Sequence, residues 1–289
     1  MATESTLGGY RLINHMVTGQ TSQVWEVAEP GSGRHFALKM LLPENTRNPT
    51  HRNYLFHEAE VGMSLHHPNI IKVLKVSRDK TNPYIIMEFF PGGNLKLRLM
   101  RKHSIVREKC HSIITQAASG FAHMHEKGWV HRDVKPDNIL CNSSGEVRII
   151  DFALATRIKR GGGGLFSFFR RKSLTVGTRS YMSPEQIRNK PLNERADLYS
   201  FGATMYELTT GRPPFRGATP NDLLNRHLKE MPASPKIHNQ ELTDECSELI
   251  LRLLEKDQTN RPKDFHEFLA QFRNIRVFIG DKMEAANRM

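Results

Sequence analysis

The first ninety or so residues alternate between short apolar runs and turn residues, a pattern that predicts a β-rich unit. Two such runs, 24–27 and 34–38, flank Pro30-Gly31-Ser32-Gly33, and this arrangement predicts a β-hairpin. A helical pattern then covers 54–65 and stops before Pro68, because proline cannot continue a helix. The chain therefore begins with strands and one helix.

Two further apolar runs, 70–76 and 84–89, precede Pro91-Gly92-Gly93, and after this break the pattern becomes helical. Apolar residues recur at helical spacing in three segments: 108–126, 196–210 and 241–254. Two short strands are expected between them: 139–141 and 147–150. The pattern predicts an α+β chain with a small β-rich lobe before the break and a larger helical lobe after it.

Composition indicates an ordinary globular protein of 289 residues, with 38% hydrophobic and 25% charged residues. This length can bury one large core or two lobes that share a cleft. No apolar run is long enough to span a bilayer, and the N-terminus lacks the apolar stretch of a secretory signal, so we expect a soluble, cytoplasmic chain with no transmembrane segment. Three scattered cysteines, Cys110, Cys141 and Cys246, suit a reducing compartment and predict neither disulfides nor a zinc site.

The net charge of +12 raises the question of nucleic-acid binding. The basic residues are spread along the chain, however, and no recognisable nucleic-acid module accompanies them. We therefore expect a basic, solvated surface that favours acidic partners or membranes, and no specific nucleic-acid partner.

The segment His131-Arg132-Asp133-Val134-Lys135-Pro136-Asp137-Asn138, with Asp151-Phe152-Ala153 after it, carries the chemistry of this chain. Phosphoryl transfer from a nucleotide needs in-line positioning, metal ions that bridge the phosphates, and a group that accepts the hydroxyl proton. Two of the acidic residues in these motifs, Asp133 and Asp151, can serve these purposes together with the lysine and the asparagine. The motifs closely resemble the catalytic loop, H-R-D-x-x-x-x-N, and the metal-binding D-F-G of eukaryotic-type Ser/Thr protein kinases.

The resemblance covers the chain from about residue 10 to residue 272 and implies the bilobal protein-kinase fold. The N-lobe would span residues 1–90 and the C-lobe residues 91–289. The implied activity is transfer of the γ-phosphate of ATP to serine or threonine hydroxyls of protein substrates. A second copy of the chain, phosphorylated in trans, is one candidate substrate.

The resemblance also implies a role for each residue of the two motifs. Asp133 would be the catalytic base, and Lys135 would reach the γ-phosphate and offset its charge. Lys135 resembles Ser/Thr rather than tyrosine kinases, which place this positive charge differently. Asn138 and Asp151 would bind Mg²⁺, with Mn²⁺ as a second candidate, because a hard cation prefers a few protein oxygens together with phosphate.

Lys39 matches the strand lysine of the V-A-I-K motif and would contact the α- and β-phosphates. Its partner is expected on the following helix, where Glu58 and Glu60 are rival candidates. The spacing of Glu58 to the His67-Pro68-Asn69 turn favours Glu58. Lys39 and Glu58 thus complete the implied catalytic set with Asp133 and Lys135.

The loop expected over the phosphates keeps one of the family's three glycines, Gly19, within residues 17–24. Glycine lets backbone N–H groups approach phosphate closely, so nucleotide binding is expected to be weaker than in a kinase with all three. Adenine would lie between Val24, Ala37 and Leu140, with Met87 behind it. The nucleotide-binding residues that the resemblance implies are Val17, Gly19, Val24, Ala37, Lys39, Glu88, Phe90 and Leu140.

Two further departures from the family pattern concern conformation rather than chemistry. Ala153 replaces the glycine of D-F-G and is expected to restrict how this segment switches. Gly62 lies one turn after Glu58, where kinases usually have a large apolar side chain that packs against the phenylalanine of D-F-G. A mid-helix glycine costs about 1 kcal/mol relative to alanine, so a mobile helix is expected.

Between Asp151 and Pro184-Glu185 the chain has an insert with four consecutive glycines, 161–164, which predicts disorder. Ser173 and Thr175 within it are candidate phosphorylation sites, and Ser173 follows a basic Arg170-Arg171-Lys172 run that suggests autophosphorylation in trans. A phosphate there could pair with Arg132 and order the segment. The alternative is a constitutively mobile loop.

Residues 177–185 match the substrate-facing loop of Ser/Thr kinases, in which Thr178 would hydrogen-bond near Asp133 and Lys135. By the same resemblance Glu185 would form a buried ion pair with Arg261, and Asp197 would brace the backbone of the catalytic loop. This substrate platform disfavours a small-molecule phosphotransferase.

The leading interpretation is an active Ser/Thr protein kinase, because every group expected to handle phosphate or metal is present. The alternative is a pseudokinase that acts as a binding or scaffold module, and the glycine-poor loop, Gly62 and Ala153 support it. Asp137 and Glu207 occupy positions at which basic-directed kinases attract substrate arginines, whereas Asn94 lacks the charge at another such position. A mild preference for basic substrates is therefore expected.

Overall fold

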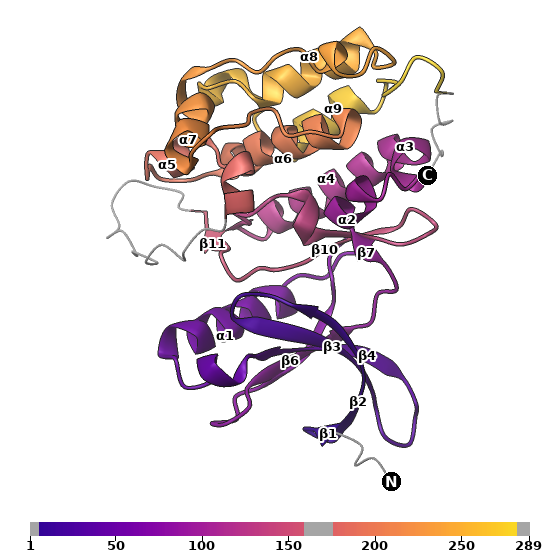
Figure 1. Cartoon of the computed structure of the whole chain (residues 1–289), viewed down its shortest axis with the longest axis vertical. Helices are drawn as coiled ribbons and strands as arrows, with labels where there is room; N and C mark the ends of the chain where they lie inside the picture. The colour runs from indigo at the N-terminus through magenta and orange to yellow at the C-terminus, as the bar shows by residue number, and fades with distance from the viewer. Residues whose placement is uncertain (1–5, 159–175, 282–289) are drawn as a thin grey trace.

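The structure is a computed structural model that describes residues 6–158 and 176–281, which form two lobes (Figure 1). The N-terminal lobe, indigo and purple in Figure 1, consists of a β-sheet and one long helix. The C-terminal lobe, from magenta to yellow, is mainly helical. The predicted α+β bilobal kinase fold is confirmed.

In the described residues, the N-terminal sheet has six strands in the order β1-β2-β3-β4-β6-β5, and each neighbouring pair is antiparallel. The strands are β1 (Thr6–Leu7), β2 (Tyr10–Thr18), β3 (Ser22–Ala28), β4 (His35–Leu41), β5 (Val73–Ser77) and β6 (Tyr84–Glu88). The predicted hairpin joins β3 to β4. Gly31 and Gly33 have φ of 81° and 65°, the left-handed region that glycine adopts without a steric penalty.

Helix α1 (Pro49–Met63) covers one face of this sheet (Figure 1). It begins at Pro49 rather than at Tyr54, because the side chain of Asn48 accepts the backbone N–H groups of Thr50 and His51 at 2.9 and 3.4 Å. Leu55 and other buried residues of α1 join the main hydrophobic core, which runs on into the C-terminal lobe. The helix is thereby anchored to β4 and β5.

The C-terminal lobe consists mainly of helices. The helices are α2 (Leu95–Met100), α3 (Ile105–Glu108), α4 (Cys110–Glu126), α5 (Pro184–Ile187), α6 (Glu194–Thr210), α7 (Pro220–Lys229), α8 (Asp244–Leu253) and α9 (Phe265–Phe272). Short 3₁₀ helices are η1 (Pro43–Asn45) in the N-terminal lobe and η2 (Pro136–Asn138), η3 (Val176–Tyr181), η4 (Pro235–Ile237) and η5 (Gln258–Asn260) here.

Helices α4 and α6 form the centre of this lobe. The rings of Phe121 on α4, Phe201 on α6 and Phe265 on α9 lie with centroids 5.2 to 5.9 Å apart. The helix predicted from Glu108 is interrupted at Lys109, whose φ of −113° and ψ of 20° separate α3 from α4. The helices predicted near 196–210 and 241–254 are present as α6 and α8.

Two small sheets lie where the lobes meet. Strands β7 (Gly93–Asn94), β9 (Ile139–Cys141) and β10 (Val147–Ile149) form one, and β8 (Trp129–Val130) and β11 (Thr156–Arg157) form the other. The change of sheet between β6 and β7 falls around the lobe boundary that we predict after residue 90. Among the described residues, no helix has both the length and the apolar character needed to cross a bilayer.

Candidate active site

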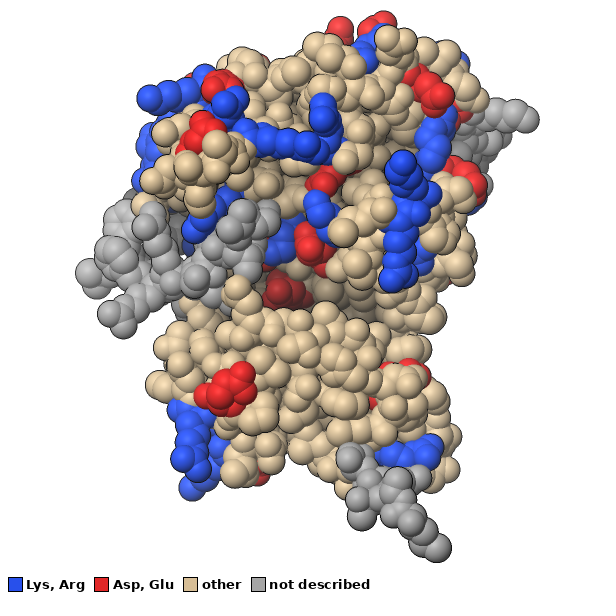
Figure 2. Space-filling view, in the orientation of Figure 1, with Lys and Arg blue, Asp and Glu red and all other residues tan. Residues whose placement is uncertain are grey.

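The face drawn in Figure 2 is hollowed between the two lobes, and acidic and basic side chains gather in the hollow. Strands β9 and β10 bring the two motifs together, because they pair antiparallel between Asn138 and Asp151. The backbone N–H of Ile150 donates to the carbonyl of Asn138 at 3.0 Å. Asp151 therefore lies beside the catalytic-loop segment that precedes it in sequence.

Lys39 on β4 pairs with Glu58 on α1. Its Nζ lies 2.7 and 2.6 Å from the two carboxylate oxygens of Glu58 and 3.6 Å from Oδ1 of Asp151. Burial opposes the charge of Lys39, but the carboxylates of Asp151 and Glu58 outweigh it and hold its pKa above the usual value. Glu60, the rival candidate, is exposed, so the lysine is paired with Glu58.

Helix α1 has a second attachment that the sequence did not indicate. Nε2 of His57 lies 2.7 Å from the carbonyl oxygen of Ala155, and its ring meets Trp129 edge-on at 5.7 Å. Trp129 in turn donates from Nε1 to Oγ of Ser64, at the C-terminal end of α1, at 3.2 Å. These contacts tie the helix that carries Glu58 to the segment that follows Asp151.

Asp133, Lys135 and Asn138 form one hydrogen-bonded cluster. Lys135 Nζ lies 2.7 Å from Oδ2 of Asp133, and Asn138 Nδ2 donates to that same oxygen at 2.9 Å and to the Asp133 carbonyl at 2.8 Å. Burial raises the pKa of Asp133, and the charge of Asp151 adds to this effect while Lys135 opposes it. The Asp133 carboxylate is thus a stronger proton acceptor than an exposed aspartate.

The backbone of the catalytic loop is held by Asp197 at the start of α6. Its two carboxylate oxygens accept the backbone N–H groups of His131 and Arg132 at 2.7 and 2.8 Å, and His125 Nε2 lies 2.8 Å away. Arg132 adopts a φ of 68°, a left-handed conformation that non-glycine residues rarely take, and these bonds hold it there. The predicted bracing role of Asp197 is confirmed.

The expected ion pair beneath the substrate-facing segment is also present. Arg261 Nη1 and Nη2 donate to the two oxygens of Glu185 at 2.7 and 3.1 Å. Both side chains are almost fully buried, with exposed fractions of 0% and 7%. Such a bidentate, desolvated pair connects the start of α5 to the segment before α9.

Both departures from the family pattern have a structural explanation. A Cβ added at Gly62 would lie 2.3 Å from Cγ2 of Val73 and 3.3 Å from the ring of Phe152, so Val73 already fills the space beside Phe152. Ala153 does not adopt a positive φ, whereas Asp151 does, at 66°. The observed conformation therefore needs glycine at position 62 and not at position 153.

The oxygen ligands expected for a divalent cation lie at the floor of the site. Asn138 donates both hydrogens of Nδ2 to Asp133, and its Oδ1 oxygen has no hydrogen-bond donor among the described residues. Asp151 contributes a carboxylate beside Lys39. One amide oxygen and one carboxylate suit Mg²⁺, a hard cation that takes its remaining ligands from phosphate and water.

The residues expected around adenine lie on three adjacent strands of the N-terminal sheet and on β9 of a separate sheet. Ala37 is paired with Met87 across β4 and β6, and Val24 with Lys39 across β3 and β4, while Leu140 packs against the same core from β9. Together these side chains can line an apolar slot.

The connection after β6 offers the expected backbone groups. The N–H of Glu88 donates to the carbonyl of Lys72 at 2.9 Å, and the Glu88 carboxylate accepts from Lys72 N and Arg148 Nε. Among the described residues, the N–H of Phe90 has no hydrogen-bond acceptor. The Glu88 carboxylate is thus already paired, and the N–H of Phe90 is the backbone donor that this segment offers among the described residues.

The loop over the site is closed by a turn. The N–H of Gly19 donates to the carbonyl of Ser22 at 2.8 Å, and a Cβ at Gly19 would meet only that carbonyl, at 3.4 Å. Val17 is 54% exposed and pairs with Val24. The conformation of the loop therefore does not itself demand glycine at position 19.

One acid expected to attract substrate arginines is already paired within the fold. Glu207 is buried, with an exposed fraction of 3%, and its oxygens are bonded to Lys96 and Tyr181. Asn94 caps α2 by accepting the N–H of Leu97 at 2.8 Å. Neither residue offers a charge to a substrate arginine. The sequence did not reveal this, because Lys96 and Glu207 are far apart along the chain.

Several predicted features lie outside the described residues. These are the glycine run 161–164, the phosphorylation candidates Ser173 and Thr175, and the side chain of Thr178.

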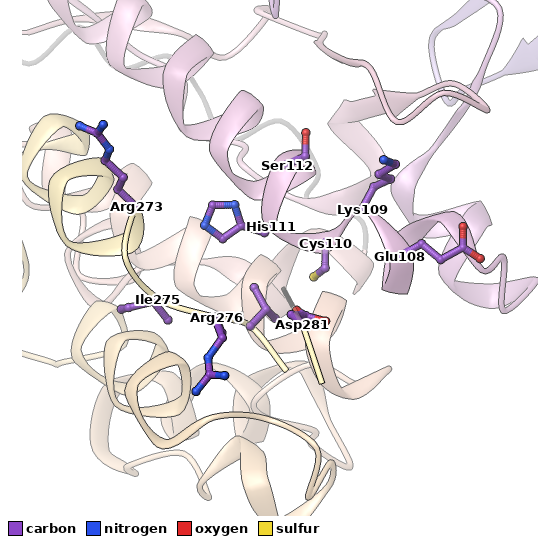
Figure 3. Close-up of a pocket in the computed structure, with 10 residues that line it drawn as sticks. Glu108, Lys109, Cys110, His111, Ser112, Arg273, Ile275, Arg276 and Asp281 are labelled. Atoms are coloured by element: carbon purple, nitrogen blue, oxygen red, sulfur yellow. The ribbon is translucent and has the colours of Figure 1, made fainter. Parts of the chain in front are cut away.

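A separate pocket of about 230 Å³ lies in the C-terminal lobe, between the start of α4 and the segment after α9 (Figure 3). It is lined by none of the predicted site residues, and Arg273 and Arg276 point away from each other there.

Comparison with known proteins agrees with this geometry. The model of the protein kinase domain family matches residues 10–272. A probable serine/threonine-protein kinase of Streptomyces coelicolor is 32% identical over 88% of this chain and 38% of its own length. Serine/threonine-protein kinase PknB of Mycobacterium tuberculosis is 30% identical over 99% of this chain and 45% of its own length.

The chain thus spans less than half the length of these curated relatives. The family match covers both lobes and every motif described above, and protein kinases in general use ATP and a divalent metal ion to phosphorylate proteins. On the agreement of motifs, fold and sequence similarity, this chain belongs to the protein kinase family.

Proposed function

We propose that this chain is an active Ser/Thr protein kinase, which transfers the γ-phosphate of MgATP to serine and threonine hydroxyls of proteins. The observation that carries the proposal is the convergence of two groups of side chains at Asp151. Lys39 lies 3.6 Å from Asp151, and the charge of Asp151 acts on Asp133. The names of the relatives, which are about 30% identical, support the Ser/Thr class.

In this proposal Asp133 accepts the proton of the acceptor hydroxyl, and its raised pKa favours that step. Lys135, at 2.7 Å from Asp133, remains beside it and offsets negative charge on the transferred group. Lys39, fixed by Glu58, orients the α- and β-phosphates. The residues therefore act mainly by positioning and by electrostatic stabilisation.

Asn138 and Asp151 would hold Mg²⁺, with Mn²⁺ as a second candidate, and the ion would neutralise phosphate charge when bound. Adenine would lie between Val24, Ala37 and Leu140, and the free N–H of Phe90 would donate to its edge. Val17, Gly19 and the carbonyl of Glu88 would complete the nucleotide contacts. The N-lobe, residues 1–90, and the C-lobe, residues 91–289, would close on the nucleotide from two sides.

The observations favour this function over a pseudokinase scaffold. The groups that would act on phosphate and metal are oriented toward one another, and Lys39 is paired with Glu58. Gly62 and Ala153, which favoured the scaffold on sequence grounds, are compatible with an assembled site, because Val73 fills the space beside Gly62 and Ala153 needs no positive φ.

The test is transfer of labelled γ-phosphate from MgATP to a generic protein substrate. An Asp133→Ala variant removes the base, and Glu248→Gln, an exposed position on α8, is the matched control. We expect incorporation with the unaltered chain and the control and none with Asp133→Ala. No incorporation by the folded, unaltered chain with either Mg²⁺ or Mn²⁺ would contradict the proposal.

We further infer that activity is regulated by phosphorylation at Ser173, carried out by a second copy in trans. Nε of Arg132 is buried without a hydrogen-bond partner among the described residues, and a phosphate would satisfy it. Mass spectrometry of the active protein should find phosphate within residues 165–178.

A cytoplasmic location fits the three cysteines, which are all free and buried.

A further inference from the structure

The side chain of Glu207 on α6 is a buried acid with both of its oxygens already occupied. Lys96 Nζ, on α2, lies 2.5 Å from Oε1, and the hydroxyl of Tyr181, at the end of η3, donates to Oε2. Burial, together with the charge of Glu207, raises the pKa of Tyr181, so the phenol stays neutral and remains a donor. The charge of Glu207 is thus balanced by one cation, and its second oxygen accepts a hydrogen bond from one hydroxyl.

This cluster adjoins the catalytic loop. Helix α2 packs against η2, the Pro136–Asn138 turn of that loop, and the charge of Asp137 reaches Tyr181. Tyr181 is also the last residue of η3, which belongs to the segment that is proposed to face the acceptor hydroxyl. Helix α2 thus lies beside the loop that carries Asp133, and the Lys96 side chain on it is 32% exposed.

We propose that Lys96 is a specificity-determining residue, whose ammonium occupies the place on Glu207 that a basic substrate side chain would otherwise take. The kinase then discriminates against peptides with arginine near the acceptor hydroxyl and favours peptides whose neighbouring residues are acidic or uncharged. This inference rests on the proposed kinase function, and it reverses the preference that the sequence predicts.

The charge of the segment that carries Lys96 supports the same conclusion, and Asp137 of the η2 turn is the acid that faces it from the catalytic loop. Residues 94–103, which include α2, contain Lys96, Arg98, Arg101 and Lys102 and no acidic residue. Basic side chains extend over the C-terminal lobe beside the hollow in Figure 2, and the whole chain carries a net charge of +12. A cationic peptide meets like charge on this side, whereas an acidic one is attracted.

The test measures peptide binding, so that it does not depend on phosphate transfer. Fluorescent serine peptides carry one arginine, alanine or glutamate at each position before the serine in turn, and their affinities are measured by anisotropy. The unaltered chain should bind no arginine peptide tighter than its alanine counterpart. Lys96→Met removes the cation and should make at least one arginine peptide bind about tenfold tighter than its alanine counterpart, as a charge-assisted bond to the released acid would.

Two variants control for folding and for bulk charge. Lys96→Met/Glu207→Gln removes both partners, avoids an uncompensated buried acid, and should lose the gain for arginine. Arg101→Met removes an exposed cation from the end of the same helix and should leave the preference unchanged.

The inference is overturned if the unaltered chain binds arginine peptides tighter than alanine peptides. It is also overturned if folded Lys96→Met gains no affinity for any arginine peptide, and an absence of measurable peptide binding counts as this result. If Lys96→Met does not fold, an arginine preference in the unaltered chain or in the double variant overturns it. Phosphate transfer is measured separately. If the peptides bind as expected but no phosphate is transferred, the kinase function is contradicted and the assignment of Lys96 remains.

Discussion

Lys39 and Glu58 come from a strand and a helix, and the two carboxylate oxygens of Glu58 lie 2.7 and 2.6 Å from one lysine Nζ. Both side chains are largely buried, with exposed fractions of 15% and 5%. Because the pair is desolvated, it fixes the distance between β4 and α1 more firmly than a surface ion pair would. The structure thus has the helix docked in the position at which Lys39 also faces Asp151.

Replacing Glu58 by glutamine should lower kcat/KM for transfer about 10- to 100-fold, because the lysine loses a charge-assisted partner worth about 1.5 to 3 kcal/mol. Steady-state kinetics with varied ATP measures this loss. Glu60→Gln, on the exposed face of the same helix, is the control and should change kcat/KM little. An equal loss of kcat/KM in Glu58→Gln and Glu60→Gln would show that Glu58 contributes only to the stability of the helix and not to the position of Lys39.

Replacing Gly62 by alanine should destabilise the protein, although alanine is the better helix former. The added Cβ would lie 2.3 Å from Val73 Cγ2, and overpacking of this kind costs about 1 to 3 kcal/mol. Urea unfolding of Gly62→Ala, Val73→Ala and the double variant measures the coupling. Without the Val73 side chain there is room for the added methyl group. Gly62→Ala should therefore lower the unfolding free energy of the Val73→Ala variant much less than that of the unaltered chain. A stabilised Gly62→Ala would mean that α1 does not lie this close to β5.

The rate of transfer should fall at low pH as Asp133 becomes protonated, and Lys135 should set where the fall occurs. Burial raises the pKa of Asp133 and Lys135 opposes the rise, so Lys135→Met should move the acid limb of the kcat profile to higher pH. The measurement is kcat against pH for both proteins, with Lys190→Met, an exposed lysine, as control. An unmoved acid limb would assign the titration to another group.

Stability should decline in acid because of His227. Burial lowers the pKa of His227 to about 3, with the charge of Lys256 adding to the effect, while the unfolded state titrates near 6.5. Between these values the unfolded state binds more protons. Unfolding free energy therefore falls as pH drops from 6.5 toward 3, by about 1.4 kcal/mol per unit from this group.

The check is urea unfolding at several pH values with His227→Phe. This variant loses the bond between Tyr199 and His227 and starts less stable, but its stability should depend less steeply on pH. His266→Gln, at an exposed position, serves as the control and should keep the slope of the unaltered chain. Parallel slopes for His227→Phe and the unaltered chain would contradict the buried, neutral histidine.

The order of elements and the identity of the candidate reacting groups could be predicted from the sequence. The hairpin around Gly31 follows from local turn chemistry, and the 131–138 motif carries its residue types at spacings of a few residues. Element boundaries were less accurate. Helix α1 begins at Pro49 rather than Tyr54, because a polar Asn48 cap and not an apolar residue starts it.

Contacts between residues far apart in the chain could not be predicted from the sequence. The sequence indicates that Lys39 pairs with an acid on the next helix, but the packing of the helix pairs it with Glu58 and leaves Glu60 exposed. It marked Glu207 as a charge for substrates, but folding places Lys96 against it. It marked Gly62 as a weakness, but Val73 fills the space. Pattern and spacing act over a few residues, whereas burial and pairing depend on which elements meet in space, and that is set by the packing of the whole fold.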